Sequence, residues 1–222
     1  MTEIITAARF DADYNLPDWR YLLGRIEATF RAPSFPAATA LAVAIADDAE
    51  AADHHPDIDI RYPGVVHVVL VTHAANGLTT LDTDLAAVIS DRATSAGATA
   101  EPTRNTSREI AIDALDIAVV MPFWQAVLGY VRVPADDPDA VDLADPLRLG
   151  PGVWFQQMDE ARPERNNVHI DVSVSHDIAE QRVADALAAG GRMVSDASAK
   201  SFWVLADPEG NEACVCTWQD RD

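Results

Sequence analysis

The segment from Ala96 to Arg108, AGATAEPTRNTSR, constrains the fold more than any other feature, because it divides the sequence into two halves. It is rich in small and polar residues, contains a proline and lacks hydrophobic periodicity, which is typical of a linker. A chain of 222 residues is long for one ordinary domain and comfortable for two of about 100 to 115 residues. We therefore expect a first domain over residues 1–96, a linker over 97–107 and a second domain over 108–222.

Composition argues against several classes of protein. Hydrophobic residues make up 49% of the chain, which indicates a globular protein. The formal net charge of -20 would repel nucleic-acid backbones and anionic membrane surfaces, so we expect neither as a partner. No apolar run approaches the roughly 20 residues of a membrane span, and the N-terminal residues do not form a secretory signal. Cys214 and Cys216 are too close in sequence for an ordinary disulfide, which favours reduced thiols in a cytoplasmic protein.

In the first half, hydrophobic spacing predicts three helices and one long strand. The run VVHVVLVT is β-branched and nearly continuous, as a buried strand would be. Thr79 or Thr80 can cap the last helix. The predicted elements are a helix over residues 19–30, a helix over 35–52, a strand over 61–72 and a helix over 81–93.

The second half reads as a strand, a helix and further strands, and then the same order again. Gly129 is a plausible residue to end the first of its helices, and Gly190-Gly191 the second. This pattern predicts an internal duplication of structure without a literal sequence repeat. The predicted elements are strands over 109–114, 153–157, 168–174, 202–205 and 212–218, helices over 122–128 and 177–189, and a tight turn over 207–211.

Histidines and carboxylates gather in the first half. His54 and His55 follow Glu50 at a predicted helix end, and His73 and Asp82 come after the predicted strand. Imidazole titrates near neutrality, with an unperturbed pKa of about 6.5. A protein that gathers such residues is suited to handling protons or a metal, although a chance grouping of surface or core histidines is the alternative.

Residues 1 to about 95 resemble pterin-4a-carbinolamine dehydratases. The family pattern has a carboxylate or similar group, then His-His-Pro, an aromatic residue, a histidine after a strand, and an aspartate. The interval between the aromatic residue and the next histidine is one residue longer in this chain, and we place the extra residue in a turn at Pro63-Gly64. The matching residues are Glu50, His54-His55-Pro56, Tyr62, Val66-His67, His73, Gly77-Leu78 and Asp82.

The resemblance implies the removal of water from a 4a-hydroxytetrahydropterin to give a quinonoid dihydropterin, a step in pterin recycling. This chemistry needs no redox cofactor, nucleophile or metal. The resemblance implies that His54 and His73 form the acid/base pair, each contributing roughly 10²–10⁴-fold, and that His55 binds the pterin or its hydroxyl group. Which imidazole is the acid stays open. Asp82 is expected to accept an N–H from His73 and fix its tautomer.

The other matching residues have two readings each. Glu50 either orients an imidazole or holds the helix end. Pro56 is expected to end the helix so that both neighbouring imidazoles project into a cleft. Tyr62 is a pocket wall or a half-buried strand residue, and His67 is structural. The predicted catalytic residues are therefore His54, His55, His73 and Asp82, and the predicted substrate-binding residues are Glu50, Pro56 and Tyr62.

Residues 108–222 resemble a glyoxalase-like branch of the vicinal-oxygen-chelate superfamily. Metal-using members place His or Glu on the first and later strands, and His169 matches one such position. The first predicted strand has no histidine, however, and Cys214 stands where a terminal Glu is expected. A divalent site needs three or more converging ligands, so we expect this half to be metal-free. The matching residues are Asp113-Ala-Leu-Asp116, Phe123-Trp124, Leu128-Gly129-Tyr130, Val168-His169-Ile-Asp171 and Asp207-Pro-Glu-Gly-Asn211.

Together these features predict two α+β domains. The first has a small antiparallel sheet with helices on one face, and the second has paired βαβββ modules. Both resembled families commonly self-associate, which implies a homo-oligomer. The function expected is that of a cofactor-free dehydratase acting on a pterin. The alternative is a non-catalytic ligand-binding or regulatory protein, with the second domain a metal-free small-molecule binding module, because fold does not settle function.

Overall fold

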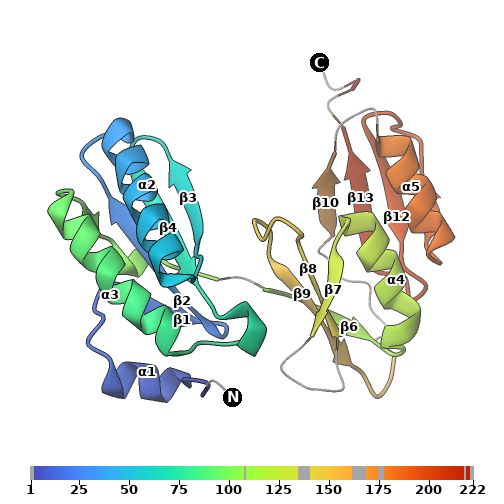
Figure 1. Cartoon of the computed structure of the whole chain (residues 1–222). Helices are drawn as coiled ribbons and strands as arrows, with labels where there is room; N and C mark the ends of the chain where they lie inside the picture. Colours follow the sequence, from blue (N-terminus) through green and yellow to red (C-terminus); the bar gives the residue numbers. More distant parts are fainter. Residues whose placement is uncertain are drawn as a thin grey trace. The chain divides into compact units, whose positions relative to one another are not determined.

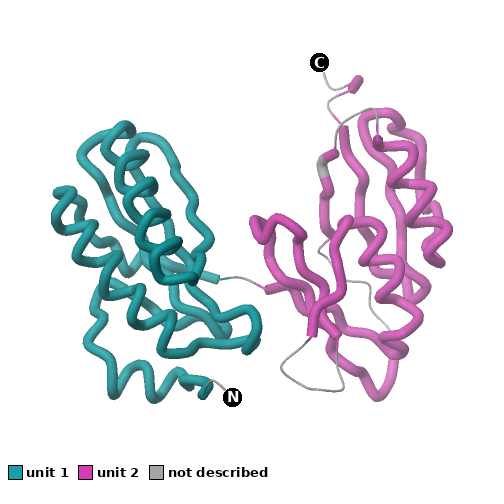
Figure 2. The backbone as a smooth tube through the Cα atoms, in the orientation of Figure 1, with its two compact units in different colours: residues 1–107 teal, residues 108–222 magenta. Residues whose placement is uncertain are grey.

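The chain forms two compact units in the computed structural model, unit 1 over residues 1–107 and unit 2 over residues 108–222 (Figure 2). The structure describes residues 3–107, 109–134, 141–161, 169–174, 178–217 and 219–220. Val168, Asp177 and Trp218, at the ends of predicted elements, lie outside these ranges. Both units combine helices with sheets, which confirms the α+β class. Within the described ranges, no helix combines the length and apolarity that a bilayer crossing requires.

Unit 1 is built on an antiparallel sheet in the order β1-β2-β4-β3, with the short strand β5 also pairing with β2. Polar and apolar residues alternate along the sequence of β2, so that Ile26, Ala28 and Phe30 point to the core. The strands are β1 (Trp19–Leu22), β2 (Arg25–Arg31), β3 (Asp57–Arg61), β4 (Val65–Leu70) and β5 (Thr99–Ala100).

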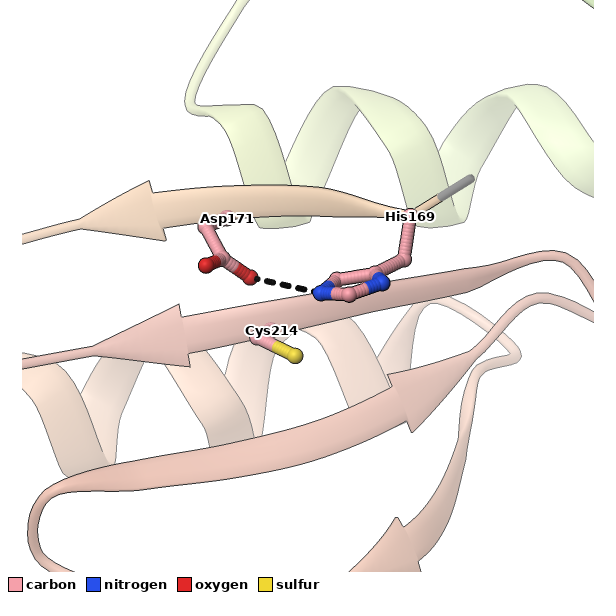
Figure 3. Close-up of side chains that lie close together, drawn as sticks. All are labelled: His169, Asp171 and Cys214. Carbon is pink, nitrogen blue, oxygen red and sulfur yellow. Dashed lines mark ion pairs between the residues drawn. The ribbon is translucent and has the colours of Figure 1, made fainter. Parts of the chain in front are cut away.

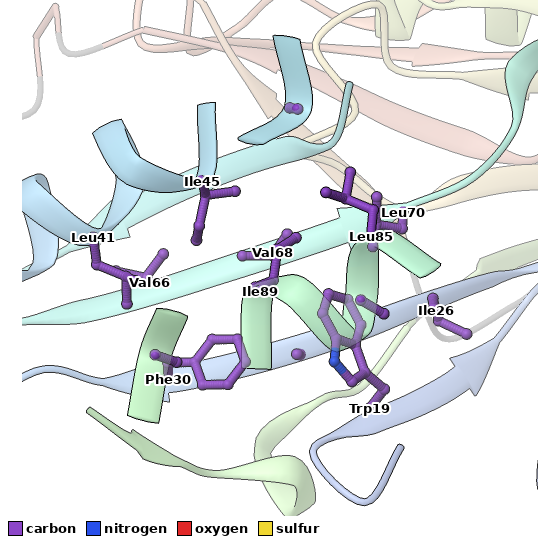
Figure 4. Packing of buried hydrophobic residues seen from close by; sticks show 14 of the residues in the cluster. Trp19, Ile26, Phe30, Leu41, Ile45, Val66, Val68, Leu70, Leu85 and Ile89 are labelled. Atoms are coloured by element: carbon purple, nitrogen blue, oxygen red, sulfur yellow. The ribbon is translucent and has the colours of Figure 1, made fainter. Parts of the chain in front are cut away.

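Two long helices, α2 (Phe35–Ala52) and α3 (Thr80–Ser95), lie on one face of this sheet (Figure 1). Ser34 caps α2 by accepting the N–H of Ala37. The shared core is apolar throughout and is drawn in Figure 4, where the labelled members are Trp19, Ile26, Phe30, Leu41, Ile45, Val66, Val68, Leu70, Leu85 and Ile89. The remaining helical elements of unit 1 are α1 (Ala7–Asp13), η1 (His73–Ala75) and η2 (Pro102–Arg104).

The predicted helix over residues 19–30 is wrong, because this segment is the β1–β2 hairpin. Leu23 and Gly24 both have positive φ, 48° and 78°, and connect the paired residues Leu22 and Arg25. Two consecutive residues with positive φ are the signature of a tight hairpin turn. The apolar residues of this segment fit both the spacing of a helix and the alternation of a strand. Gly24 is the sequence signal that favours the hairpin over the helix.

The predicted strand over residues 61–72 is two strands of a hairpin, because β3 ends at Arg61 and β4 begins at Val65. The pairing of β4 with β2 runs without interruption from Val65 to Leu70, so β4 contains no bulge. Gly64, in the turn, lies against the backbone of Ala32, where an added Cβ would be only 2.8 Å from the carbonyl oxygen. Close backbone approach therefore requires glycine at this turn.

Residues 99–107, expected as part of a linker, lie along β2. The carboxylate of Glu101 accepts two hydrogen bonds of 3.1 Å from Arg31. Asn105 donates to the backbone carbonyl of Glu27 at 2.9 Å, and the hydroxyl of Thr29 donates to its side-chain oxygen at 2.6 Å. Backbone pairing of β5 and polar side chains hold most of this segment, which is why hydrophobic periodicity does not reveal it.

Unit 2 contains two βαβββ modules with the same strand order. In each module the first strand pairs in parallel with the fourth, which gives the sheets β6-β9-β8-β7 and β10-β13-β12-β11 (Figure 1). This confirms the predicted paired modules. The elements are β6 (Glu109–Ala114), α4 (Ile117–Leu128), β7 (Val131–Pro134), β8 (Val141–Ala144), β9 (Gly152–Gln157), β10 (Ile170–Ser173), α5 (Ala179–Ala188), β11 (Arg192–Ser195), β12 (Phe202–Ala206) and β13 (Glu212–Cys216).

Helix α4 begins earlier than predicted, because Asp116 caps it by accepting the N–H of Val119 and Pro122 lies inside it. It ends at Gly129, whose φ of 73° gives the left-handed conformation expected of a terminating glycine.

The predicted tight turn over residues 207–211 is confirmed, because the backbone N–H of Asp207 bonds to the carbonyl oxygen of Asn211. Asp207 is fully buried, and its carboxylate accepts the indole N–H of Trp124 at 3.0 Å. This bond ties the second module to the helix of the first.

Candidate active site

The C-terminal end of α2 determines where the His-His-Pro segment lies. The helix ends at Ala52, and Asp53 follows in the left-handed conformation with a φ of 50°. The backbone N–H of His54 then bonds to the carbonyl oxygen of Ala49 at 3.1 Å. The chain thus turns at Asp53, a common way to end a helix. The prediction that Pro56 ends the helix is wrong, since Pro56 lies just before β3.

His54 is bonded to a fully buried carboxylate. Its Nε2 lies 2.7 Å from Oδ1 of Asp82, and the two side chains are 9% and 0% exposed. Because an ionised carboxylate only accepts hydrogen bonds, this contact places a proton on Nε2. No described residue bonds to Nδ1, and no buried side-chain nitrogen or oxygen among the described residues lacks a partner. Nδ1 is therefore the ring atom that remains open to solvent.

The other oxygen of Asp82 is held by the start of α3. Oδ2 accepts the backbone N–H of Thr79 at 2.7 Å and the hydroxyl of Thr72 at 2.8 Å. Thr79 and Asp82 form a capping box at the N-terminus of the helix. The hydroxyls of Thr72 and Thr79 lie 2.7 Å apart. One carboxylate therefore serves as both helix cap and partner of an imidazole, and contacts with three residues, His54, Thr72 and Thr79, fix its position.

Asp82 was expected to orient His73, but the histidine bonded to it is His54. The reason is that the carboxylate faces the end of α2, a contact between segments far apart in sequence. His73 is exposed and begins η1, directly after Thr72. Thr72 and Thr79 were missed as site residues, although the spacing Thr79-x-x-Asp82 is the sequence signature of a capping box.

His55 lies in a different environment from His54. Its Nε2 is 2.9 Å from Oε1 of Glu50, and the two side chains are 57% and 77% exposed. The two neighbouring imidazoles therefore differ in burial and in the carboxylate that each contacts. Glu50 therefore contacts an imidazole, as the first of its two predicted readings requires.

The last two candidates in unit 1 lie in the β3–β4 hairpin. Tyr62 stands in the turn and is 87% exposed, so the expectation of a half-buried strand tyrosine is wrong. His67 lies within β4, where its Nδ1 is 3.0 Å from the hydroxyl of Thr29 and its Nε2 is 3.6 Å from Glu27. These contacts agree with the structural role predicted for His67.

Unit 2 brings together His169, Asp171 and Cys214, which we call the β10–β13 cluster (Figure 3). Their nitrogen, oxygen and sulfur ligand atoms all lie within 4.8 Å of one another. Nε2 of His169 is 3.2 Å from Oδ1 of Asp171. Burial, followed by a hydrogen bond with Asp171, raises the pKa of Cys214 to about 12. His169 and Cys214 were compared with family ligand positions from the sequence, whereas Asp171 was named only as part of a family motif.

Comparison with known proteins identifies unit 1. The model of the pterin 4 alpha carbinolamine dehydratase family matches residues 3–92. A protein from Nocardia farcinica whose name places it in this family is 51% identical over 79 residues, which are 36% of this chain and 82% of that protein. Another, from Thermosynechococcus vestitus, is 40% identical over 94 residues, or 42% of this chain and 98% of that protein.

The chain belongs to the pterin-4a-carbinolamine dehydratase family. All seven predicted site residues of unit 1 lie within the matched range. Among solved structures, a transcriptional coactivator/pterin dehydratase from Brucella melitensis has 26% identity and a TM-score of 0.37, covering 41% of this chain and 99% of its own.

The dehydratase family accounts for less than half of the chain. A second family model, described as a glyoxalase-like domain, matches residues 109–216, nearly the whole of unit 2. This match confirms the resemblance drawn from the sequence of the second half. The β10–β13 cluster lies inside the matched range and shares no residue with the dehydratase match.

Proposed function

We propose that unit 1 catalyses the dehydration of a 4a-hydroxytetrahydropterin to the quinonoid dihydropterin by histidine acid/base catalysis, as part of pterin recycling. The observation that carries this proposal is the bond between His54 and the buried Asp82. It supplies an imidazole with a fixed tautomer and one open nitrogen, which is what repeated proton transfer needs. Membership of the dehydratase family supports the choice of reaction.

In the proposed reaction, His54 receives the proton that leaves a pterin ring nitrogen. The imidazolium that results carries its positive charge beside the carboxylate of Asp82, which stabilises it. An opposite charge within hydrogen-bonding distance is most effective where water is excluded, and Asp82 is fully buried. The open Nδ1 is the atom of His54 that meets the substrate.

His73 is proposed to protonate the hydroxyl that leaves C4a, which departs as water. The substrate thus loses a hydroxyl and, to His54, one ring-nitrogen proton, a net loss of one water molecule. Thr72, the preceding residue, bonds to the same carboxylate as His54. This shared partner supports a common site for the two histidines, since it ties the backbone at His73 to the carboxylate that holds His54. Solvent then restores both protonation states.

The exposed pair His55 and Glu50 is proposed to bind the pterin or its hydroxyl group. An exposed imidazole held by a carboxylate can exchange its water contacts for substrate contacts at small cost. Pro56 and Tyr62 belong to the proposed substrate-binding residues through the family resemblance. The reaction as proposed uses proton transfer alone and requires no cofactor.

The test is the turnover of His54→Ala and His73→Ala with a 4a-hydroxytetrahydropterin. Each change should lower kcat by about 10²–10⁴-fold, the usual contribution of a general acid or base, while circular dichroism shows an intact fold. His67→Gln is the matched control, because it removes an imidazole from the same unit at a structural position. Wild-type turnover in both alanine variants would overturn the mechanism. If the wild type changed the absorbance of a pterin on binding but did not turn it over, unit 1 would be a binding module and not an enzyme.

A further inference from the structure

The segment over residues 101–107, which we call the strap, is bonded to β2 of unit 1 by polar side chains. We propose that His67 is a proton-dependent switch for the strap: with both ring nitrogens protonated it keeps Asn105 bonded to the sheet, and the loss of one proton breaks a bond to Asn105. Unit 1 ends at residue 107, so the switch acts on the last residues before unit 2. The inference does not depend on the dehydratase reaction proposed above.

Two neighbouring strands supply the residues that meet the strap. Thr29 of β2 and His67 of β4 are direct partners in the antiparallel register. They alternate with the core residues that pack under the helices, so they lie on the opposite face of the sheet, together with Glu27. Glu27 and Thr29 are only 3% and 5% exposed. Their polar groups are therefore buried and need hydrogen-bond partners.

The contacts of Asn105 fix the direction of the hydrogen bonds. Its side-chain nitrogen donates to the carbonyl oxygen of Glu27 at 2.9 Å, which leaves Oδ1 to face Thr29. The hydroxyl of Thr29 lies 2.6 Å from this oxygen and donates its single proton to it. Nδ1 of His67 is 3.0 Å from the same hydroxyl oxygen and must be the donor in that contact. Nδ1 therefore carries a proton.

The second ring nitrogen of His67 faces a carboxylate. Nε2 lies 3.6 Å from Oε2 of Glu27. The other oxygen of Glu27 accepts a hydrogen bond from Arg25 at 2.8 Å and one from the hydroxyl of Ser107 at 2.9 Å, as an ionised carboxylate does. This charge would repel a lone pair on Nε2, so Nε2 also carries a proton and the ring is an imidazolium. The contacts then form a closed ring that begins at the carbonyl group of Glu27 and ends at its carboxylate.

A neutral imidazole cannot keep every contact in this ring. It has one donor and one acceptor nitrogen, and the carboxylate of Glu27 holds the remaining proton on Nε2. Nδ1 then accepts the hydroxyl proton of Thr29, and Oδ1 of Asn105 loses its donor. Imidazole changes its charge near neutral pH, and the His67 side chain is 28% exposed, so solvent reaches it. The strap is thus held more firmly below the pH at which His67 loses its proton than above it.

Other charged groups lie around His67 on the neighbouring strands and on the strap. Glu101 accepts two hydrogen bonds from Arg31, which lower the pKa of Glu101. The remaining groups are Asp59 of β3, opposite His67, with its partner Arg61, and Arg20 of β1, Arg25 of β2 and Arg104 of the strap. Carboxylates and guanidinium groups ordinarily change their charge far from neutral pH. His67 is therefore the group of this surface suited to respond there.

The test is an NMR titration of the full chain between about pH 5 and 9, a range that spans the usual titration of imidazole. In the wild type, the side-chain amide signals of Asn105 should shift over the same pH range as the ring signals of His67. The exchange of the strap amides with water, corrected for its intrinsic dependence on pH, should become about 2–10-fold faster across this transition, which corresponds to the loss of one hydrogen bond.

Thr29→Val removes the hydroxyl between the two residues at nearly constant volume, and His67→Gln removes the titrating ring. Each should abolish the transition of the strap. Thr29→Ser is the matched control, because it keeps the hydroxyl and should keep the transition. The two disruptive variants test the proposal independently if one of them fails to fold. Strap signals that do not follow the His67 ring in the wild type, or a strap transition that survives in Thr29→Val or in His67→Gln, would overturn the proposal.

Discussion

Each unit contains a histidine bonded to an aspartate, and the two pairs differ in their surroundings far more than in their distances. His54 and Asp82 lie 2.7 Å apart with side chains 9% and 0% exposed, whereas His169 and Asp171 lie 3.2 Å apart with side chains 53% and 59% exposed. Water screens the second pair, and an exposed ion pair contributes at most about 1 kcal/mol. Burial, not distance, therefore separates the fixed pair of unit 1 from the exposed pair of unit 2.

The elements that carry the aspartates explain the difference. Asp82 caps α3, where a backbone N–H and the hydroxyl of Thr72 hold its second oxygen. Asp171 stands on the strand β10, where its contacts are with the side chains of His169 and Cys214. The backbone contact fixes the position of the Asp82 carboxylate.

The largest effect is expected from Asp82→Asn, which breaks the buried pair while keeping its shape. An amide cannot accept on both sides, so either His54 or the helix N-terminus faces an N–H group. We expect kcat to fall by about 10²–10⁴-fold, the full contribution of a general acid or base. Stability to urea should fall by about 1–3 kcal/mol, the cost of a buried unsatisfied group. Dehydratase kinetics and urea unfolding measure the two.

Asp84→Asn is the control for this change, because Asp84 lies in the same turn of α3 and is exposed. It should leave kcat unaltered and change stability by no more than about 0.5 kcal/mol. If Asp82→Asn kept full turnover, the buried pair would be a structural feature and not a catalytic one.

A smaller effect is expected from Thr72→Val, which removes one hydroxyl from the carboxylate and leaves the volume nearly unchanged. A hydrogen bond to a charged group is worth about 1.5–3 kcal/mol, so kcat should fall by at most about 10–150-fold. KM should stay the same, because Thr72 acts through Asp82 and not on the substrate. Thr72→Ser restores the hydroxyl and should restore kcat. Loss of stability in the valine variant with unchanged kcat would limit Thr72 to a structural role.

The sequence predicted those parts of the fold whose signals are local. The bounds of α2 are as predicted, because Ser34 and Pro36 mark its start and apolar residues recur along one face. β6 is likewise as predicted. The hairpin over residues 19–31 was not predicted, because its apolar residues fit both the period of a helix and that of a strand, and only Gly24 distinguishes the two. β7, β8 and β11, with four residues each, are too short for a periodic pattern to identify.

The sequence named candidate residues of unit 1 but did not reveal which of them contact one another. The family motif marks His54 and Asp82, yet nothing in their spacing reveals that the end of α2 meets the start of α3. The same holds for Asp171 and Cys214, whose contact depends on the parallel pairing of β10 with β13. Contacts between distant segments are set by tertiary packing, which a single sequence does not display.

The smallest effect is expected from Glu50→Gln, which breaks a third histidine–carboxylate pair. His55 and Glu50 lie 2.9 Å apart, between the distances of the other two pairs, and both are exposed. If burial determines the value of such a pair, this change costs at most about 1 kcal/mol, or less than about tenfold in kcat/KM. The loss should shrink further at high salt, because exposed charges are screened. Kinetics at low and high ionic strength measure both. A loss as large and as salt-independent as that of Asp82→Asn would show that the pairing itself matters more than its burial, and the contrast between the two units would then need another cause.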